Sequence, residues 1–553
     1  MEYEDFSDPA LGEFVEETMK EFKTPGMAVL VTHGNRTWAK GYGYSDIADK
    51  VPVTPSTLFF AGSTTKSFTA SMAAHLVEDE QFPEVSWKTP LAKLIRDDFV
   101  LDQGSPNGQW ATNHITLEDA LSMRTGMPRH DLTWINGDPS NRDLVRQMRH
   151  LPLHNELREK FEYCNLMYTA VSYATETTIG RPFKELLKQH IFHPLGMNET
   201  TYTLSDAMEI AEKHEEAKVA RGYLWDSDVK EYEVVPFESI APAKGSGGII
   251  SNVLDYKHWV KHLMKPSGLP MALREKSAMA IRTPKMLTDP DPRRPQTGPR
   301  AYCMGLYSQV YRGREILWHS GATAGYMALM LMVPPTPTEL KEGEEDCGWA
   351  VVIMQNTYSL AQDVVAWYLL DKFLQTPENE RHDMAQAARD TEARATESMA
   401  TDKVLERLFG EKSIETGLNP TLPLQHYEGI YQHPAYHEFR ISAATSESKE
   451  GSVSQTQQQE HNSEEKSKGA APGLQLYLRS GGLQTAYCDV SATLHHVSGD
   501  WWWSHQRLGP SSWLTDHALK VQFVIDAKGG VQGMRYQAEV AMPEHLAFFK
   551  KIE

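Results

Sequence analysis

Residues 59–66 read Phe-Phe-Ala-Gly-Ser-Thr-Thr-Lys and lead into a helix predicted over residues 64–77, which carries an apolar stripe. Ser63 stands at the first turn of this helix, near the positive end of the helix dipole. Lys66 follows three residues later, so it lies on the same face and within reach of the Ser63 hydroxyl. In a pocket that excludes water the pKa of a lysine falls, and the neutral amine can then accept the hydroxyl proton.

The same Ser-x-x-Lys spacing recurs at three other places, namely Ser227/Lys230, Ser446/Lys449 and Ser463/Lys466. Only Ser63 is followed by an apolar helix, which is the context that a buried reactive pair needs. A serine at a helix start is also an ordinary N-cap, so a purely structural role stays open for the pattern by itself.

A second polar segment, Tyr163-Cys164-Asn165, is the only Tyr-x-Asn in the chain and precedes a helix predicted over 166–179, which Gly180 ends. A phenol becomes a usable base only beside a cation such as Lys66, because its ordinary pKa is near 10. Packing of the tyrosine against the helix start is the structural alternative. Cys164 is interpreted as a small filler, with a redox-sensitive thiol as its alternative.

A third segment, Trp318-His319-Ser320-Gly321-Ala322, lies at a predicted strand edge. Gly321 lets a ligand approach the backbone closely, and the amide of Ala322 can join that of Ser63 in an oxyanion hole. His319 can also be an ordinary strand-end residue. Lys-x-Gly sequences that compete with this segment occur at Lys341, in an acidic loop, and at Lys528, in a turn.

The order of the predicted elements indicates one sheet built from both ends of the first 375 residues. A helix (11–22) and a hairpin (27–31 and 37–44) begin the chain, and a predominantly helical stretch follows. A further helix is predicted from Thr116, with Asp119 completing a capping box, to about Gly126. Three strand-like apolar runs (315–318, 326–333 and 349–354) and a last helix (361–374) then close the region.

The remaining residues predict a linker and a second, smaller domain. Residues 376–422 are polar and helix-prone, which favours a helical linker after a catalytic domain over 1–375. Residues 423–553 show short strands, turns and the cluster Trp501-Trp502-Trp503, which we interpret as the core of an all-β module. Within this module, 442–473 is too polar to form a core and is expected to be disordered.

The composition excludes several classes of protein. The chain has 553 residues, a net charge of −19 and four cysteines. The negative charge argues against nucleic-acid partners and anionic membranes, and scattered cysteines do not frame a disulfide-rich module. The N-terminus lacks a signal peptide and no apolar run reaches 18 residues, so a cytoplasmic protein is expected. No zinc-protease motif H-E-x-x-H and no α/β-hydrolase G-x-S-x-G occur, and no cofactor or metal is expected.

The three segments, in this order, resemble those of the serine β-lactamase-related hydrolases, which include class C β-lactamases, D-aminopeptidases, family VIII esterases and lovastatin-type acyltransferases. Four further stretches are similar to motifs of that family: Leu-Ser-Met-Arg-Thr-Gly-Met-Pro at 121–128, Phe-Glu-Tyr-Cys-Asn at 161–165, Pro-Leu-Gly-Met at 194–197 with Thr200, and Gly-Gly-Ile-Ile-Ser at 247–251. The sequence from Tyr427 to Pro434 resembles the start of a lipocalin-like module that such enzymes often carry.

The resemblance implies an α/β fold of the β-lactamase/transpeptidase type, an antiparallel sheet flanked by helices with an inserted helical domain. It also implies site roles: Ser63 as acylated nucleophile, with Lys66 and Tyr163 sharing the roles of base and acid. Asn165 would orient Lys66 and hold the acyl amide or ester. His319 and Gly321 would line the cleft, with the amides of Ser63 and Ala322 binding the oxyanion. β-Lactamases place a lysine where His319 stands, so a mostly neutral histidine favours uncharged esters, thioesters or amides.

Three functions remain open on the sequence. The first is a serine hydrolase that cleaves a small-molecule ester or amide through an acyl-Ser63 intermediate. The second is an acyltransferase with the same mechanism in small-molecule biosynthesis, which differs in how well it excludes water from the acyl-enzyme. The third is a non-catalytic scaffold that binds a ligand or partner.

Overall fold

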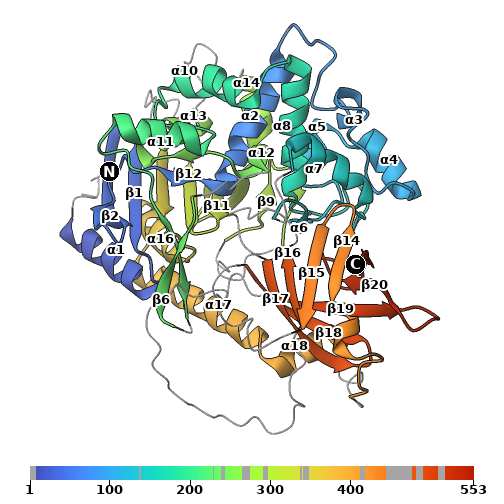
Figure 1. Cartoon of the computed structure of the whole chain (residues 1–553). Helices are drawn as coiled ribbons and strands as arrows, with labels where there is room; N and C mark the ends of the chain where they lie inside the picture. Colours follow the sequence, from blue (N-terminus) through green and yellow to red (C-terminus); the bar gives the residue numbers. More distant parts are fainter. Residues whose placement is uncertain are drawn as a thin grey trace. The chain divides into compact units, whose positions relative to one another are not determined.

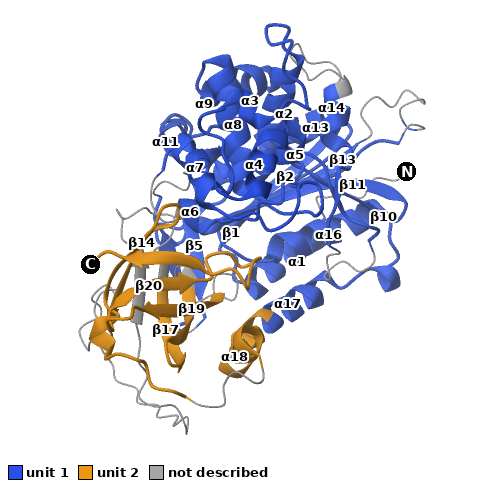
Figure 2. Cartoon of the chain, turned by 90° about the vertical axis from the view of Figure 1, so that its right-hand side faces the viewer, with its two compact units in different colours: residues 1–134, 138–394 blue, residues 135–137, 395–553 orange. Residues whose placement is uncertain are grey.

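A computed structural model describes residues 8–135, 139–227, 229–237, 243–264, 275–289, 297–336, 339, 348–410, 417–443, 476–480, 490–508 and 517–553. The chain divides into two compact units, coloured separately in Figure 2. The first comprises residues 1–134 and 138–394, and the second comprises 135–137 and 395–553. The division at 394/395 falls inside helix α17 (Met384–Ser398), within the stretch expected to be a linker.

The first unit is built on a nine-stranded antiparallel sheet with the order β3-β2-β1-β13-β12-β11-β10-β9-β8. Strand β1 pairs with β2 on one side and with β13, more than 300 residues later, on the other. The prediction of one sheet formed from both chain ends is therefore confirmed. The strands of this sheet are β1 (Gly26–His33), β2 (Arg36–Asp46), β3 (Val51–Pro52), β8 (Met286–Leu287), β9 (Ala301–Tyr302), β10 (Tyr307–Tyr311), β11 (Arg314–Thr323), β12 (Tyr326–Val333) and β13 (Trp349–Gln355).

The central strands are buried on both faces. Every residue of β12 and β13 is buried, as are all of β1 except His33. Continuous apolar runs of this kind require helices on both sides of a sheet. Figure 2 shows α1 (Pro9–Glu21) and α16 (Ala361–Phe373) on one side, and α2 (Thr65–Glu78), α8 (Asn165–Ile179) and α13 (Val253–Met264) on the other.

The inserted helical part lies between β3 and β8 in the chain, and the segment that carries Ser63 leads into α2, near its start. Figure 1 shows α2 and α8 in this part. The expected capping box at Thr116 is present, and Gly180 ends α8 with a φ of 74°. The helix at Thr116 is shorter than predicted, because it ends at Leu121 and Met123 turns the chain with a φ of 57°. The remaining helices are α3 (Leu91–Leu94), α4 (Pro106–His114), α5 (Leu117–Leu121), α6 (Leu132–Ile135), α7 (Asn141–Gln147), α9 (Phe183–Leu187), α10 (His193–Leu195), α11 (Leu204–Lys213), α12 (Lys244–Gly247) and α14 (Glu275–Arg282).

Two small sheets complete the first unit: β4 (Phe59–Phe60) pairs with β7 (Ile250–Ser251), and β5 (Gly222–Asp226) pairs with β6 (Glu231–Val235). Strand β4 leads through the 3-10 turn η1 (Gly62–Thr64) into α2, so the β4–β7 pair anchors the start of the segment that carries Ser63.

The second unit contains a closed antiparallel barrel of eight strands, which confirms the predicted all-β module. Trp502 points into the buried interior and Trp503 packs with Ala518 against Val404 and Leu408 of α18 (Thr401–Phe409). Of the segment expected to be disordered, 444–473 lies outside the described residues. The barrel strands are β14 (Gly429–His433), β15 (His437–Ala443), β16 (Leu476–Ser480), β17 (Val490–Ser498), β18 (Trp501–Leu508), β19 (His517–Ile525), β20 (Val531–Tyr536) and β21 (Ala547–Lys551).

The helices of both units share one further property. Within the described ranges, none combines the length and the apolar composition that a bilayer-spanning helix needs.

Candidate active site

Ser63 lies in η1, pressed closely against the edge of β11. Gly62 adopts a φ of 51°, and a Cβ there would lie 2.6 Å from the nitrogen of Ala322. A Cβ on Gly321 would lie 1.9 Å from the carbonyl oxygen of Ala61 and 3.0 Å from the nitrogen of Ser63. Both positions therefore require glycine, because any side chain would push the nucleophile segment away from the strand. Ser63 itself is partly exposed, so a substrate can reach it.

Lys66 is fully buried one turn along, beneath Ser63. Its Nζ lies 2.7 Å from Asn165 Oδ1 and 3.1 Å from the carbonyl oxygen of Ser246, both of which can only accept, and 3.0 Å from Ser63 Oγ. None of these three partners is charged, and a neutral amine that donates to the first two keeps its lone pair for the Ser63 hydroxyl. Burial, and then the charge of Arg129, lower the pKa of Lys66 well below its usual value. The arrangement therefore favours a neutral amine in contact with the serine hydroxyl.

Tyr163 completes this group from the loop before α8. It hydrogen-bonds with Ser63, and its ring centroid lies 4.8 Å from Lys66 Nζ and 4.9 Å from Arg129 Cζ. Burial raises the pKa of Tyr163 above its usual value, although the charge of Arg129 opposes this. The phenol is thus protonated at neutral pH and is disposed to donate a proton.

The amide of Ala322 faces Ser63 because of the register of the β11–β12 hairpin. Thr323 pairs with Tyr326 across a two-residue loop, and this pair exchanges hydrogen bonds in such hairpins. Alternation then directs the N–H of Ala322 away from β12. The β10 strand pairs with β11 only as far as Trp318, so it does not cover this edge. The N–H groups of Ser63 and Ala322 therefore lie on neighbouring backbone segments, as an oxyanion hole requires.

His319 is nearly inaccessible, with 2% of its surface exposed. Its Nε2 lies 3.1 Å from the hydroxyl of Tyr302, and its Nδ1 lies 2.6 Å from the carbonyl oxygen of Ser320. Nδ1 is the protonated nitrogen in this pairing, since a carbonyl oxygen can only accept. Burial and the charge of Lys66 lower the pKa of His319 to about 3, so the ring is neutral. It packs among the rings of Tyr163, Tyr302 and Tyr307.

The structure thus brings Ser63, Lys66, Tyr163 and Asn165 into one hydrogen-bonded group. Gly321 and Ala322 lie beside its nucleophile, and His319 lies against its tyrosine. Cys164 is fully buried, with its N–H donating to the sulfur of Met123 at 3.1 Å. The described residues contain no cluster of three or more His, Cys, Asp and Glu side chains suited to a metal ion.

Sequence reasoning missed three contributors to this group. Ser246 lies in α12, just before the Gly-Gly-Ile-Ile-Ser stretch at 247–251, and its carbonyl oxygen accepts from Lys66. Arg129 and Asp131 follow directly after the motif at 121–128, and this position was the only signal for them. Asp131 Oδ1 accepts from Asn165 Nδ2 at 2.9 Å, and its Oδ2 accepts from Arg129 Nε at 2.7 Å.

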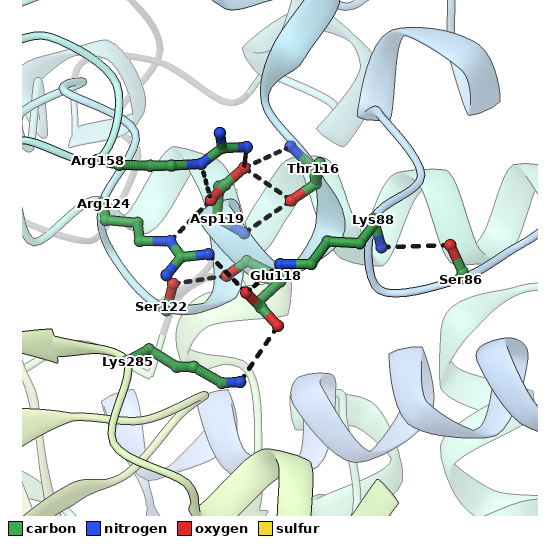
Figure 3. A network of polar contacts seen from close by, with 9 residues as sticks. All are labelled: Ser86, Lys88, Thr116, Glu118, Asp119, Ser122, Arg124, Arg158 and Lys285. Carbon is green, nitrogen blue, oxygen red and sulfur yellow. Dashed lines mark hydrogen bonds and ion pairs between the residues drawn. The ribbon is translucent and has the colours of Figure 1, made fainter.

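A second polar network holds the segments that lead into this site (Figure 3). Asp119, fully buried, accepts from Thr116, from Arg124 at 2.7 Å and from Arg158 at 2.7 and 2.9 Å. Glu118 bonds to Arg124, Lys88 and Lys285. The network joins the 116–124 segment to the loop at 155–163, which carries Tyr163. It is an ion-pair cluster with no contact to Ser63 or Lys66.

Comparison with known proteins agrees with this geometry. The β-lactamase family model matches residues 11–376. The chain is 36% identical over 449 residues to unguisins hydrolase ungD' of Aspergillus campestris, covering 79% of each chain. It is also 36% identical over 455 residues to unguisins hydrolase ungD of Aspergillus violaceofuscus, covering 78% of this chain and 76% of the relative.

Among solved structures, an octameric penicillin-binding protein homologue from Pyrococcus abyssi shares the fold with a TM-score of 0.56 and 19% identity, over 98% of this chain and 99% of that one. A D-amino acid amidase from Ochrobactrum anthropi matches with a TM-score of 0.52 and 21% identity, over 68% and 99%. Both agree with the α/β fold that the motifs predicted. The chain belongs to the β-lactamase family and is a serine hydrolase that acts on an amide or ester.

Proposed function

We propose that Ser63 is the nucleophile, Lys66 the general base and Tyr163 the proton donor to the leaving group. One observation carries this assignment: a fully buried lysine with only uncharged hydrogen-bond acceptors lies 3.0 Å from the Ser63 hydroxyl. A lysine in that environment is neutral and can take the hydroxyl proton as Oγ attacks. The protonated state of Tyr163 at neutral pH supports its assignment as the acid.

The reaction follows from these positions. Lys66 Nζ takes the proton as Ser63 Oγ attacks the substrate carbonyl carbon, and the carbonyl oxygen becomes an oxyanion held by the N–H groups of Ser63 and Ala322. The intermediate collapses with cleavage of the amide or ester bond, and Tyr163 protonates the departing amine or alcohol while Lys66 returns its proton to Tyr163. Water then attacks the acyl-Ser63 ester by the same steps, releasing the acid.

We further propose that the substrate is a small uncharged amide or ester. Where a β-lactamase has a cationic lysine, this chain has a neutral histidine with a pKa of about 3, packed among tyrosine rings. The buried ring places no positive charge at this position, and the half-buried Tyr163 and Tyr307 beside it suit apolar or aromatic groups better than a carboxylate. The two Aspergillus relatives are named as hydrolases of unguisins, and this chain is proposed to act on a molecule of that kind.

The test is intact-mass spectrometry after incubation with p-nitrophenyl esters of increasing acyl length. We expect a single acyl adduct that is absent from Ser63→Ala. No adduct and no turnover at any acyl length would reject the assignment. Adding alcohols or amines to the same reaction separates hydrolysis from acyl transfer, because a transferase would give the acylated acceptor in place of the free acid.

A further inference from the structure

Asn165 can help catalysis only if its amide is oriented correctly. Its Oδ1 accepts from Lys66 Nζ at 2.7 Å, so its Nδ2 must point away from the lysine. A flipped amide would place N–H groups against the amine and remove this acceptor from it. Something has to fix the orientation, since the two ends of an asparagine amide have nearly the same shape.

Asp131 is placed to do so. Its Oδ1 accepts from Asn165 Nδ2 at 2.9 Å and from Trp134 Nε1 at 3.0 Å. A carboxylate is acceptor-only, so it pairs with the NH₂ end of the amide and rejects the oxygen end. The other carboxylate oxygen accepts from Arg129 Nε at 2.7 Å. The Asp131 side chain is 19% exposed and the Arg129 side chain 51% exposed.

The backbone between these two residues is held in an uncommon conformation. His130 adopts a φ of 46°, a region that non-glycine residues rarely occupy. Its carbonyl oxygen accepts from both the N–H and the hydroxyl of Thr133, and its Nε2 lies 3.1 Å from the carbonyl oxygen of Pro152. The turn is thus fixed from both sides, with Arg129 over the ring of Tyr163 and Asp131 against Asn165.

We propose that Asp131 is a positioning residue that orients the Asn165 amide toward Lys66, and that Arg129 is its counter-ion and places a positive charge over Tyr163. The inference rests on the proposed function of Ser63 and Lys66. Both residues would act through Asn165, Lys66 and Tyr163, without touching the reacting atoms themselves.

The two charges act on Lys66 in opposite directions. The positive charge of Arg129 lowers the pKa of Lys66, whereas the negative charge of Asp131 raises it. Other titratable groups around Lys66 come from the start of α8 and from β11, namely Tyr163, Cys164, Tyr168 and His319. Among these, burial keeps Tyr163, Tyr168 and His319 uncharged at neutral pH, and an ionised Cys164 would raise the pKa of Lys66 as Asp131 does. Arg129 and Asp131 are the two charges that the test changes.

The first experiment is a double-mutant cycle on kcat for hydrolysis of a p-nitrophenyl ester. Asp131→Ala is expected to lower kcat on the order of 10²-fold in the wild-type background, the scale of a misplaced catalytic group. In an Asn165→Ala background, the same substitution is expected to cost less than about 3-fold, because its partner is already gone. Equal losses in both backgrounds would overturn the positioning role.

The second experiment compares pH profiles of kcat/KM from about pH 5 to about pH 10. In Asp131→Asn, which keeps the shape and an acceptor oxygen, the rising limb is expected to move to lower pH. In Arg129→Gln it is expected to move to higher pH. Arg389→Gln, which removes an exposed ion pair with Glu21 on α1, is the matched control and leaves the profile unchanged. The proposed roles of Asp131 and Arg129 would be wrong if the rising limb of the pH profile stayed in place in both variants or moved in the same direction in both.

The outcomes separate this inference from the proposed function. If wild-type protein gives neither an acyl-Ser63 adduct nor turnover, the proposed function itself fails. If wild-type protein acylates normally and the Asp131 and Arg129 variants match it in rate and profile, only the positioning inference fails. If Asp131→Ala does not fold, the pH profile of Asp131→Asn decides.

Discussion

Two buried titratable groups in the same unit, Lys66 and Asp119, have hydrogen-bond partners of opposite kinds. Lys66 bonds to a hydroxyl, an amide oxygen and a backbone carbonyl, none of which is charged. Asp119 bonds to the guanidinium groups of Arg124 and Arg158 (Figure 3). Burial opposes ionisation of both, but only Asp119 has opposite charges in direct contact to outweigh it. The partners therefore decide whether a buried titratable group stays neutral or stays ionised.

Replacing Lys66 is expected to have the largest effect, and on activity only. Lys66→Gln removes the proposed base and should lower kcat/KM by about 10²–10⁴-fold. The midpoint of thermal unfolding should change little, because no ion pair is lost and a desolvated amine is removed. Steady-state kinetics and circular dichroism melting measure the two effects. A variant that melts far below the wild type but keeps its activity would refute the distinction.

Replacing Asp119 is expected to lower the stability of the fold and to change the activity little. Asp119→Asn keeps the shape but leaves Arg124, whose side chain is only 13% exposed, with one carboxylate partner in place of two. Breaking a buried ion pair on one side costs about 3 kcal/mol. The free energy of unfolding of the first unit, from urea titration followed by tryptophan fluorescence, should fall by that amount. Activity per folded molecule should fall less than about tenfold, which a catalytic role for Asp119 would exceed.

Asp119 and Lys66 are expected to change the stability of the fold in different pH ranges. Burial opposes ionisation of Asp119, but hydrogen bonds from Arg158 and Thr116 and the charge of Arg124 lower its pKa to about 2. Its ordinary pKa is about 3.9, so it stabilises the fold above about pH 4, and this contribution, on the order of 2 kcal/mol, is lost as pH falls to about 2. Acid unfolding of Asp119→Asn should lack this component.

Lys66 is expected to affect the stability of the fold at higher pH than Asp119 does, because proton binding is again linked to folding. Because burial lowers its pKa in the folded state, the unfolded chain binds a proton that the folded chain does not. Stability should therefore rise with pH between this lowered value and about 10.4, where the unfolded lysine also loses its proton. The slope should be smaller in Lys66→Gln. Equal slopes in the two proteins would mean that Lys66 is protonated in the folded state.

The smallest effect on stability is expected for Lys88, an exposed member of the ion-pair cluster around Glu118 and Asp119. Lys88 bonds to Glu118 at 2.7 Å, as close as Arg124 does to Asp119, but its side chain is 68% exposed. Exposed ion pairs contribute about 0–1 kcal/mol, so Lys88→Ala should lower the free energy of unfolding by less than about 1 kcal/mol. A loss matching that of Asp119→Asn would show that distance, and not burial, determines the strength of these pairs.

Local spacing was sufficient to predict several helices and strands and the contact between Ser63 and Lys66. The i, i+3 relation places Lys66 beside Ser63 in any helix, the Thr116 capping box formed as expected, and the apolar runs at 326–333 and 349–354 became β12 and β13. Helix ends were less predictable, since α5 stops at Leu121 where Met123 turns the chain.

The sequence by itself therefore determined which residue types stand together within one element, and through them the family and the kind of chemistry. The tertiary structure decided how those residues behave. Contacts between distant segments produce three features of the site. They are the hydrogen bond from Lys66 to the carbonyl of Ser246, 180 positions away, the hydrogen bond from Asn165 to Asp131, and the burial of His319. The physical reason is that a pKa depends on desolvation and on nearby charges in space, and neither is encoded in the spacing of residues along one helix.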